Sequence, residues 1–269
     1  MNHMRKTPPP RGLSTWRRAV LGMAMACGLL AGYSGSATAA NLQVSPISLE
    51  FSPREQAQGI WLSNSGTTPL RAQVRVQQWS QTDNQDQLAA TRELAASPPA
   101  VDIPPGEKQL VRIIRLQPAQ PALEQTYRLI IDELPAATAD GSAPPGLLFL
   151  LRYSVPVFIG VEDPAPATGK PSDISQLAAS LQAAAQPATL TVKNTGRKRV
   201  KISQLVHVDA AGKRTPLASG LLGYVLAGQQ MQWPLNLSTL QGEPGAGTLK
   251  AKFNADLEEQ TLPLVTRLP

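Results

Sequence analysis

The chain has 269 residues, of which 42% are hydrophobic and only 4% aromatic, with 25 Lys and Arg against 19 Asp and Glu. Five of these bases and none of the acids lie in residues 1–40, so the remainder carries 20 bases against 19 acids and has no net charge that would favour nucleic-acid binding. The only cysteine, Cys27, also lies in residues 1–40, which leaves the remainder without a disulfide. That remainder, about 230 residues, suffices for two ordinary domains.

Residues 1–40 have the pattern of a secretory signal peptide. Basic residues come first, and an apolar run rich in small residues follows from Ala19 to Ala31. The segment ends on Ser36-Ala-Thr-Ala-Ala40. We expect cleavage after Ala39 or Ala40. The apolar run is shorter than a typical membrane span, and no later segment is apolar enough, so we expect no stable membrane insertion.

The first expected strand, residues 42–51, changes sides at a proline. Its apolar residues have one parity before Ser45-Pro46 and the other parity after it: Leu42 and Val44, then Ile47, Leu49 and Phe51. Such a strand can pair first with one sheet and then with another. An irregular edge strand is the alternative.

Short alternating runs split by Gly, Pro and Asn continue along the chain, as in antiparallel β-proteins. From Leu70 to Val76 apolar and polar residues alternate strictly, and a second alternating run starts at Tyr127. Turn residues recur at Asn64-Ser-Gly66, at Pro104-Pro-Gly106 and at Ala211-Gly212. This spacing predicts an all-β fold, either sandwich or barrel.

The chain also repeats itself in order. Ile60-Trp-Leu-Ser-Asn64-Ser-Gly66 is echoed by Leu190-Thr-Val-Lys-Asn194-Thr-Gly196, and Ile103-Pro-Pro-Gly106 is echoed by Val225-Leu-Ala-Gly228. Two domains of one kind explain this better than one large barrel. We expect domains at residues 41–160 and 172–269, joined by a linker at residues 161–171 that is rich in Pro, Ala and Gly.

Residues suited to catalysis are scarce. After residue 40 the single histidine is His207, on an alternating run where a solvated or hydrogen-bonded side chain is the ordinary expectation. Glu258 and Glu259 are neighbours and would point to opposite faces of a strand. Metal-ligand spacings, nucleophile motifs and phosphate-binding loops are missing from the sequence. We therefore expect no enzyme activity, no cofactor and no metal.

The run from Leu147 to Arg152 contains five large apolar side chains in six residues. A strand buried on both faces would have this composition. An edge strand with the same composition would aggregate unless it paired with a partner strand. Both interpretations are open at this point.

The sequence resembles the PapD-like periplasmic pilus chaperones, and within them the archaic branch that serves spore-coat-protein-U-like pilins. The resemblance covers residues 41–160 closely and 171–269 loosely. It depends on these segments: Gly59-Ile-Trp-Leu-Ser-Asn64, Ser97-Pro-Pro99, Gly106-Glu-Lys108, the block Glu124 to Pro135, and Arg152-Tyr-Ser-Val-Pro156. It implies two immunoglobulin-like β-sandwich domains in tandem and a periplasmic location. It also implies pilin subunits lacking their final strand, and an outer-membrane usher, as partners.

The resemblance further implies that Leu147, Phe149 and Leu151, on the last strand of the first domain, enter the subunit in place of its missing strand. Classical members hold the subunit carboxylate with an Arg on the first strand and a Lys on the last. Here residues 41–53 contain no base, and Pro156 stands where we align the lysine. Among basic residues that could replace them we rank Arg128 first, then Arg152 and Arg112. Each could equally be a solvated residue or form a salt bridge, with Asp132 and Glu133 close by.

Two other classes of function compete with an assembly chaperone. A structural or adhesive fimbrial component could be built from similar domains, but sugar-binding adhesins expose more aromatic residues than this sequence contains. A pilin would need its own N-terminal donor strand, and Pro46 interrupts residues 41–51. An extracellular carbohydrate-processing enzyme is disfavoured by the lack of catalytic side chains.

Overall fold

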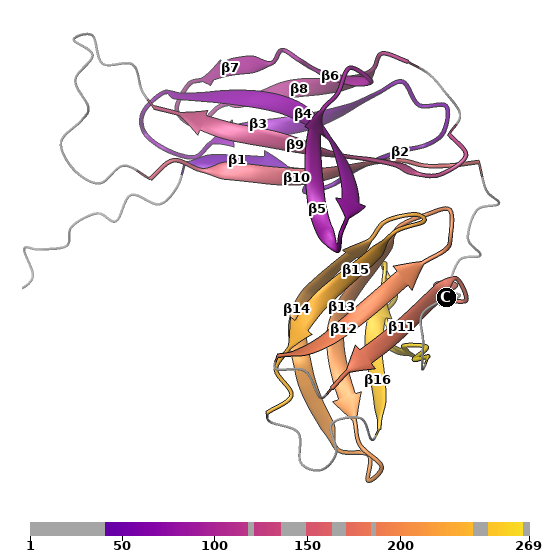
Figure 1. Cartoon of the computed structure of the whole chain (residues 1–269). Coiled ribbons are helices and arrows are strands. Elements are labelled where there is room, and N and C mark those ends of the chain that lie inside the picture. Colours follow the sequence, from indigo (N-terminus) through magenta and orange to yellow (C-terminus); the bar gives the residue numbers. More distant parts are fainter. Residues whose placement is uncertain are drawn as a thin grey trace, which may run out of the picture. The chain divides into compact units, whose positions relative to one another are not determined.

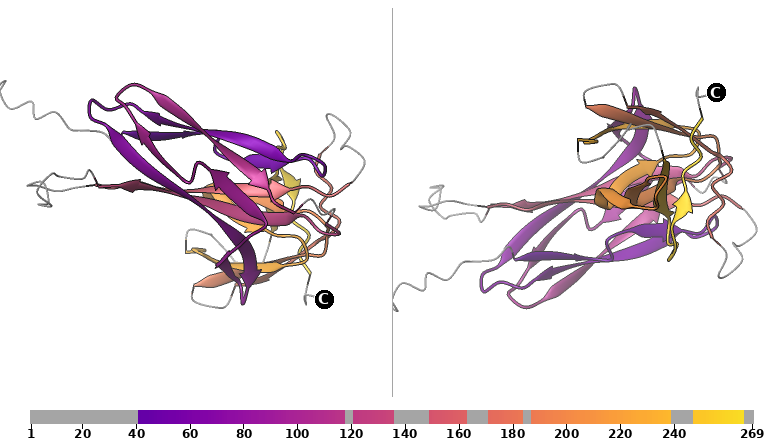
Figure 2. Two further views of the ribbon diagram at one scale, coloured as in Figure 1. Left: turned by 90° about the horizontal axis from the view of Figure 1, so that it is seen from above. Right: turned by 90° about the horizontal axis from the view of Figure 1, so that it is seen from below.

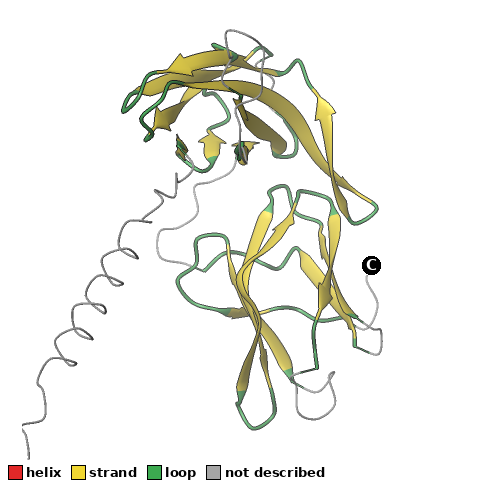
Figure 3. Cartoon of the chain, turned by 90° about the vertical axis from the view of Figure 1, so that its left-hand side faces the viewer, coloured by secondary structure: helices red, strands yellow, loops and turns green. Residues whose placement is uncertain are grey.

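The computed structural model describes residues 41–117, 121–135, 149–162, 171–183, 187–238 and 247–265; the predicted signal peptide, Leu147 and most of the predicted linker lie outside these ranges. Within them the chain forms strands and loops only (Figure 3). None of the described segments is a helix of the length and hydropathy that a membrane span requires. Two successive β-sandwiches result (Figure 1), which confirms the predicted all-β class with two immunoglobulin-like sandwiches in tandem.

The first sandwich consists of two sheets. One has the strand order β1-β3-β8-β6 and the other the order β2-β10-β9-β4-β5, with β7 also paired to β4. The strands are β1 (Leu42–Ser45), β2 (Leu49–Phe51), β3 (Ala57–Asn64), β4 (Leu70–Thr82), β5 (Gln85–Ala90), β6 (Leu94–Ser97), β7 (Ala100–Ile103), β8 (Lys108–Arg115), β9 (Gln125–Leu134) and β10 (Arg152–Ile159). β9 and β10 lie side by side in Figure 1 and pair over eight residues; Figure 2 shows the chain from above and from below.

The core of the first sandwich comes from alternate residues of each strand, as the sequence pattern predicts. On β4 the buried side chains are Leu70, Ala72 and Val74, and on β9 Tyr127 and Leu129 are completely buried. The residues between them face the outside of the sheet. Arg128 and Asp132 therefore lie on the outer face of this sheet, with Arg75 on the adjacent strand.

The predicted change of sides in the first strand is confirmed. β1 pairs antiparallel with β3 in one sheet, whereas β2 pairs parallel with β10 in the other. The chain crosses between the two sheets at Ser45-Pro46, and both pieces end up at sheet edges. Because the parity changes at the crossing, Leu42 and Leu49 both reach the same core.

The second sandwich has sheets ordered β11-β12-β15 and β14-β13-β16-β17. Its strands are β11 (Leu177–Gln182), β12 (Ala188–Asn194), β13 (Val200–Val208), β14 (Arg214–Val225), β15 (Gln230–Leu235), β16 (Thr248–Phe253) and β17 (Gln260–Thr261). Its core includes Leu190, Ile202 and Phe253. His207 is buried on β13.

The sequence echoes correspond to one structural device used in each sandwich. The buried Asn64 accepts a hydrogen bond from the Gly66 amide and donates to the carbonyls of Thr68 and Ile103. Asn194 likewise accepts from the Gly196 amide, and it donates to the carbonyls of Lys198, Val225 and Leu226. The glycines of the second echo both adopt positive φ, 73° at Gly106 and 70° at Gly228. Each asparagine thus ties its own turn to the second echo of the same sandwich.

Candidate functional site: an open strand edge

Strand β10 is paired along its whole length on one side but only along part of it on the other. β9 pairs with every residue from Arg152 to Ile159, whereas β2 pairs only with the last three residues, starting at Val157. Among the described residues, no strand pairs with the stretch from Arg152 to Pro156 on the β2 side. The first half of β10 is therefore an open sheet edge.

Two hydrogen bonds establish which backbone groups point toward that edge. The Glu133 amide donates to the Leu151 carbonyl at 2.9 Å, and the Gly160 amide donates to the Phe51 carbonyl of β2 at 2.9 Å. Odd-numbered residues of β10 thus bond to β9, and even-numbered residues point toward the β2 side. The groups left at the open edge are the N–H and C=O of Arg152 and Ser154. Proline has no N–H, and it stands where β2 begins to cover the edge.

Apolar side chains continue this edge beyond the strand. β10 begins at Arg152, so the predicted donor residues Phe149 and Leu151 lie just before it, and Leu147 lies outside the described residues. Phe149 is 77% exposed and Leu150 43% exposed, which excludes burial on both faces for these two. Leu151 is half-buried against the core of the first sandwich. An exposed apolar segment beside an open edge can accept a partner strand.

Arg128 lies directly opposite Pro156 on the outer face of the same pair of strands. Its guanidinium stacks 3.7 Å from the centre of the Trp79 ring. Burial lowers the pKa of Arg128, and the charge of Asp86 opposes that shift. In the described part of the chain no carboxylate is within ion-pair distance of Arg128. A partly desolvated cation that forms no ion pair with a carboxylate is a favourable place for an incoming anion.

Arg152 already has a partner. Its side chain forms an ion pair with Asp132, which also accepts a hydrogen bond from Arg75 at 2.5 Å. Burial alone would raise the pKa of Asp132, but the hydrogen bonds and charges of Arg152 and Arg75 outweigh it and lower the pKa. The salt bridge that sequence reasoning left open as an alternative for Arg152 is therefore present. Arg75 was not among the predicted residues, and only its place in the alternating run hinted at its exposure.

The structure separates Arg112 from the other two arginines. Arg112 is exposed on β8, where it pairs with Gly59 and Ser97 in the opposite sheet. Its neighbours Val111 and Ile113 face the core, so Arg112 points away from the sandwich on the other side from Arg128. Arg128 and Arg152 share one face and are four residues apart along the ladder, about 13 Å.

Comparison with known proteins gives the family. Residues 41–161 match the family described as pili and flagellar-assembly chaperone, PapD N-terminal domain. The first sandwich is a PapD N-terminal domain. The predicted resemblance to the PapD-like pilus chaperones is thereby confirmed.

Several solved structures similar to the chain are chaperones. One is a chain of the CsuC–CsuE chaperone–tip adhesion subunit pre-assembly complex from the archaic chaperone-usher Csu pili of Acinetobacter baumannii (26% identity, 84% of this chain, 98% of that chain, TM-score 0.61). The YadV chaperone (18%, 83%, 100%, 0.57) and the Pseudomonas aeruginosa CupB2 chaperone (15%, 81%, 97%, 0.52) share the fold. The similarity to the Csu complex agrees with the expected archaic branch. A comparison with curated protein sequences finds no match.

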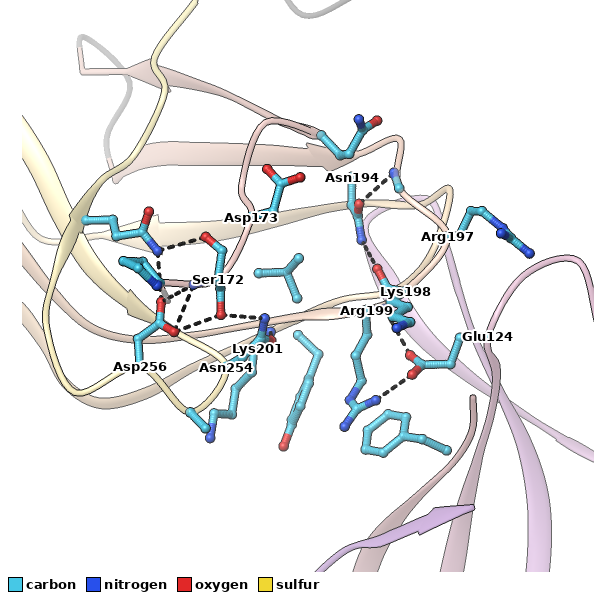
Figure 4. Close-up of a pocket in the computed structure, with 18 of the residues that line it drawn as sticks. Glu124, Ser172, Asp173, Asn194, Arg197, Lys198, Arg199, Lys201, Asn254 and Asp256 are labelled. Carbon is cyan, nitrogen blue, oxygen red and sulfur yellow. Dashed lines mark hydrogen bonds and ion pairs between the residues drawn. The ribbon is translucent and has the colours of Figure 1, made fainter. Parts of the chain in front are cut away.

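A second polar site, which sequence reasoning missed, involves the PapD N-terminal domain and the second sandwich (Figure 4). Arg199, just before β13, contacts the buried Glu124 and the exposed Glu50, each at 2.5 Å, and its guanidinium lies 3.3 Å from the centre of the Phe158 ring. Burial raises the pKa of Glu124, and the positive charge of Arg199 opposes the rise. The only sequence hint was the basic run Arg197-Lys198-Arg199 after the Asn194 turn. This ion triad cross-links residues from both sandwiches.

Proposed function

We propose that this protein is a periplasmic chaperone for pilus assembly. In this proposal it binds pilin subunits that lack their final strand, and it stabilises them by supplying a strand of its own until an outer-membrane usher receives them. The observation that carries the proposal is the open first half of β10 with the exposed Phe149 beside it, in a PapD N-terminal domain.

The physical argument is that the incomplete subunit and the open edge of β10 each lack a partner strand. An immunoglobulin-like subunit without its last strand exposes an apolar groove and two unpaired edges, and would aggregate. The edge of β10 offers main-chain donors and acceptors at Arg152 and Ser154, and the family resemblance implies that Leu147, Phe149 and Leu151 fill the groove. That one similar structure is a chaperone–tip adhesion subunit complex supports a subunit of this kind as the client.

The carboxylate at the subunit's C-terminus is assigned in this proposal to Arg128. Its guanidinium forms no ion pair with a carboxylate among the described residues, and it neighbours Pro156, the position of the classical lysine in our alignment. Arg152 is a weaker candidate because Asp132 already neutralises it, and Arg112 weaker still because it points away from this face. A guanidinium can grip a carboxylate with two parallel hydrogen bonds.

The proposal is tested by isolating the protein from the periplasm. The full chain with a C-terminal tag is expressed in its host, the periplasmic fraction is purified, and co-purifying proteins are identified by mass spectrometry. We expect a pilin subunit in stoichiometric amount and a mature N-terminus at Ala40 or Asn41.

Recovery of the chain from assembled pili would instead indicate a structural fimbrial component. A soluble periplasmic form retaining residues 1–40 would contradict the predicted cleavage. Delivery is tested by adding the purified complex to membranes containing the usher and following subunit transfer.

A further inference from the structure

One hydrogen bond joins the two sheets of the first sandwich beside the open edge. The Tyr153 hydroxyl, on β10, donates to the Leu42 carbonyl of β1 at 2.6 Å. The two residues are 111 positions apart. β1 is an edge strand of one sheet, and Tyr153 lies in the open half of β10 in the other sheet. The Tyr153 side chain is half-buried and packs against the core on its way across the sandwich.

The Leu42 carbonyl is an acceptor that strand pairing leaves unused. The Ser65 amide donates to the Asn41 carbonyl at 2.9 Å, so Asn41 and every second residue after it bond to β3. Leu42 and Val44 therefore direct their backbone groups away from β3. Among the described strands none pairs with β1 on that side, so the hydroxyl of Tyr153 binds a free edge acceptor.

Tyr153 also lies in the half of β10 that has no second neighbour. Residues from Val157 onward are held between β9 and β2, whereas Tyr153 and Ser154 are held by β9 alone. The hydroxyl contact to Leu42 is a second attachment for this half, made to the opposite sheet. We propose that Tyr153 is a positioning residue: its hydroxyl braces the open half of β10 against β1, and so holds the edge and the preceding Phe149 ready for a partner strand.

This inference rests on the proposed function: Tyr153 is the residue that preorganises the open half of β10 for strand binding. A strand that is already ordered loses less conformational freedom when a partner strand binds to it. Without the brace, the first half of β10 can separate from the core while β9 remains attached. Tyr153→Phe removes the oxygen, keeps the ring and leaves the Leu42 carbonyl at an edge that water can reach.

The first test uses the free mature chain. Amide hydrogen exchange followed by NMR should accelerate several-fold at residues 153 and 155 in Tyr153→Phe and stay unchanged at Val157, which β2 secures. The second test measures the affinity of the subunit that co-purifies with the wild-type chain. We expect Tyr153→Phe to weaken binding roughly two- to tenfold, the range of one neutral hydrogen bond, with an unchanged melting temperature.

Tyr127→Phe is the matched control. The Tyr127 hydroxyl is also hydrogen-bonded within the first sandwich, to Glu93, but its side chain is fully buried and it lies beside the part of β10 that β2 covers. This variant should lower the melting temperature and leave subunit affinity unchanged. Wild-type exchange rates and affinity in Tyr153→Phe would overturn the brace, and tighter binding would show instead that the hydroxyl competes with the incoming strand. If neither the wild-type chain nor Phe149→Asp binds a pilin, the proposed function itself fails.

Discussion

Arg128 on β9 and Pro156 on β10 are direct cross-strand partners in the PapD N-terminal domain. From the resemblance to the classical pilus chaperones we expect the proline to stand at the position of their anchoring lysine, and the arginine places a cation on the neighbouring strand of the same face. The proline, which has no backbone N–H, suits a position at the end of an open edge. The arginine keeps a positive charge close to the same end of the open segment.

Arg128→Ala should weaken subunit binding by tenfold or more, because one charge-assisted contact to the carboxylate contributes about 1.5–3 kcal/mol. Arg128→Lys should restore only part of it, since an ammonium lacks the planar fork. Affinity is measured by titration with the intact subunit and with a subunit amidated at its C-terminus. Arg112→Ala, an exposed arginine of the other sheet, is the control. If amidation weakens wild type and Arg128→Ala equally, the anchor lies elsewhere.

Phe149→Asp should abolish subunit capture without unfolding the free chain. Phe149 is largely exposed in the free protein, so the carboxylate is solvated until a partner buries it. Burial of that charge in an apolar groove costs on the order of 3 kcal/mol or more, over a hundredfold in Kd. Pull-down from periplasm and thermal unfolding give the two measurements. Leu116→Asp, at another exposed apolar residue, should alter neither. A large loss of stability in Phe149→Asp would show that the residue belongs to the core.

Asn64→Ala and Asn194→Ala should each destabilise their own sandwich by about 2–3 kcal/mol, because each removal leaves buried backbone groups without partners. Chemical denaturation monitors both variants. Asn236→Ala, which removes only an exposed turn contact to the Ser238 amide, should change stability by less than about 1 kcal/mol. An unchanged midpoint in either buried variant would mean that water replaces the asparagine.

The ion cluster around Asp132 should make stability depend on pH in one direction. The folded-state pKa of Asp132 lies below its ordinary value of 3.8, so the unfolded chain binds the proton more readily. Its contribution is complete well above pH 3.8 and disappears as the pH falls through and below that value. Relative to wild type, Asp132→Asn should be less stable by about 1 kcal/mol at pH 7, with the difference shrinking toward pH 3. Asp102→Asn, which removes the exposed ion pair with Arg71, should show little difference at either pH.

Local pattern was enough to predict several parts of this fold. The alternation from Leu70 to Val76 gave β4, the parity change at Pro46 gave the crossing between sheets, and the repeated Asn-x-Gly turns gave two related domains. Each of these features depends only on residues that are close together in the sequence. The contacts of Tyr153 with Leu42 and of Arg199 with Glu124 join residues far apart in sequence, and no periodicity records which distant side chains meet. The Arg75–Asp132–Arg152 cluster was predicted in part. Asp132 was recognised as a possible salt-bridge partner, but the pairing of β4, which brings Arg75 beside it, was not predicted.

The matching asparagines allow the two sandwiches to be aligned strand by strand. Counting from Asn64 and from Asn194, β4 corresponds to β13 and β9 to β16, so β10 corresponds to β17. The pairing that spans eight residues in the first copy spans two in the second. The copies also differ elsewhere: β5, β6 and β7 stand between β4 and β8, whereas β14 alone stands between β13 and β15. In the first copy the longer strand extends past its second neighbour and leaves an open edge, while the asparagine-held turns are alike in both copies.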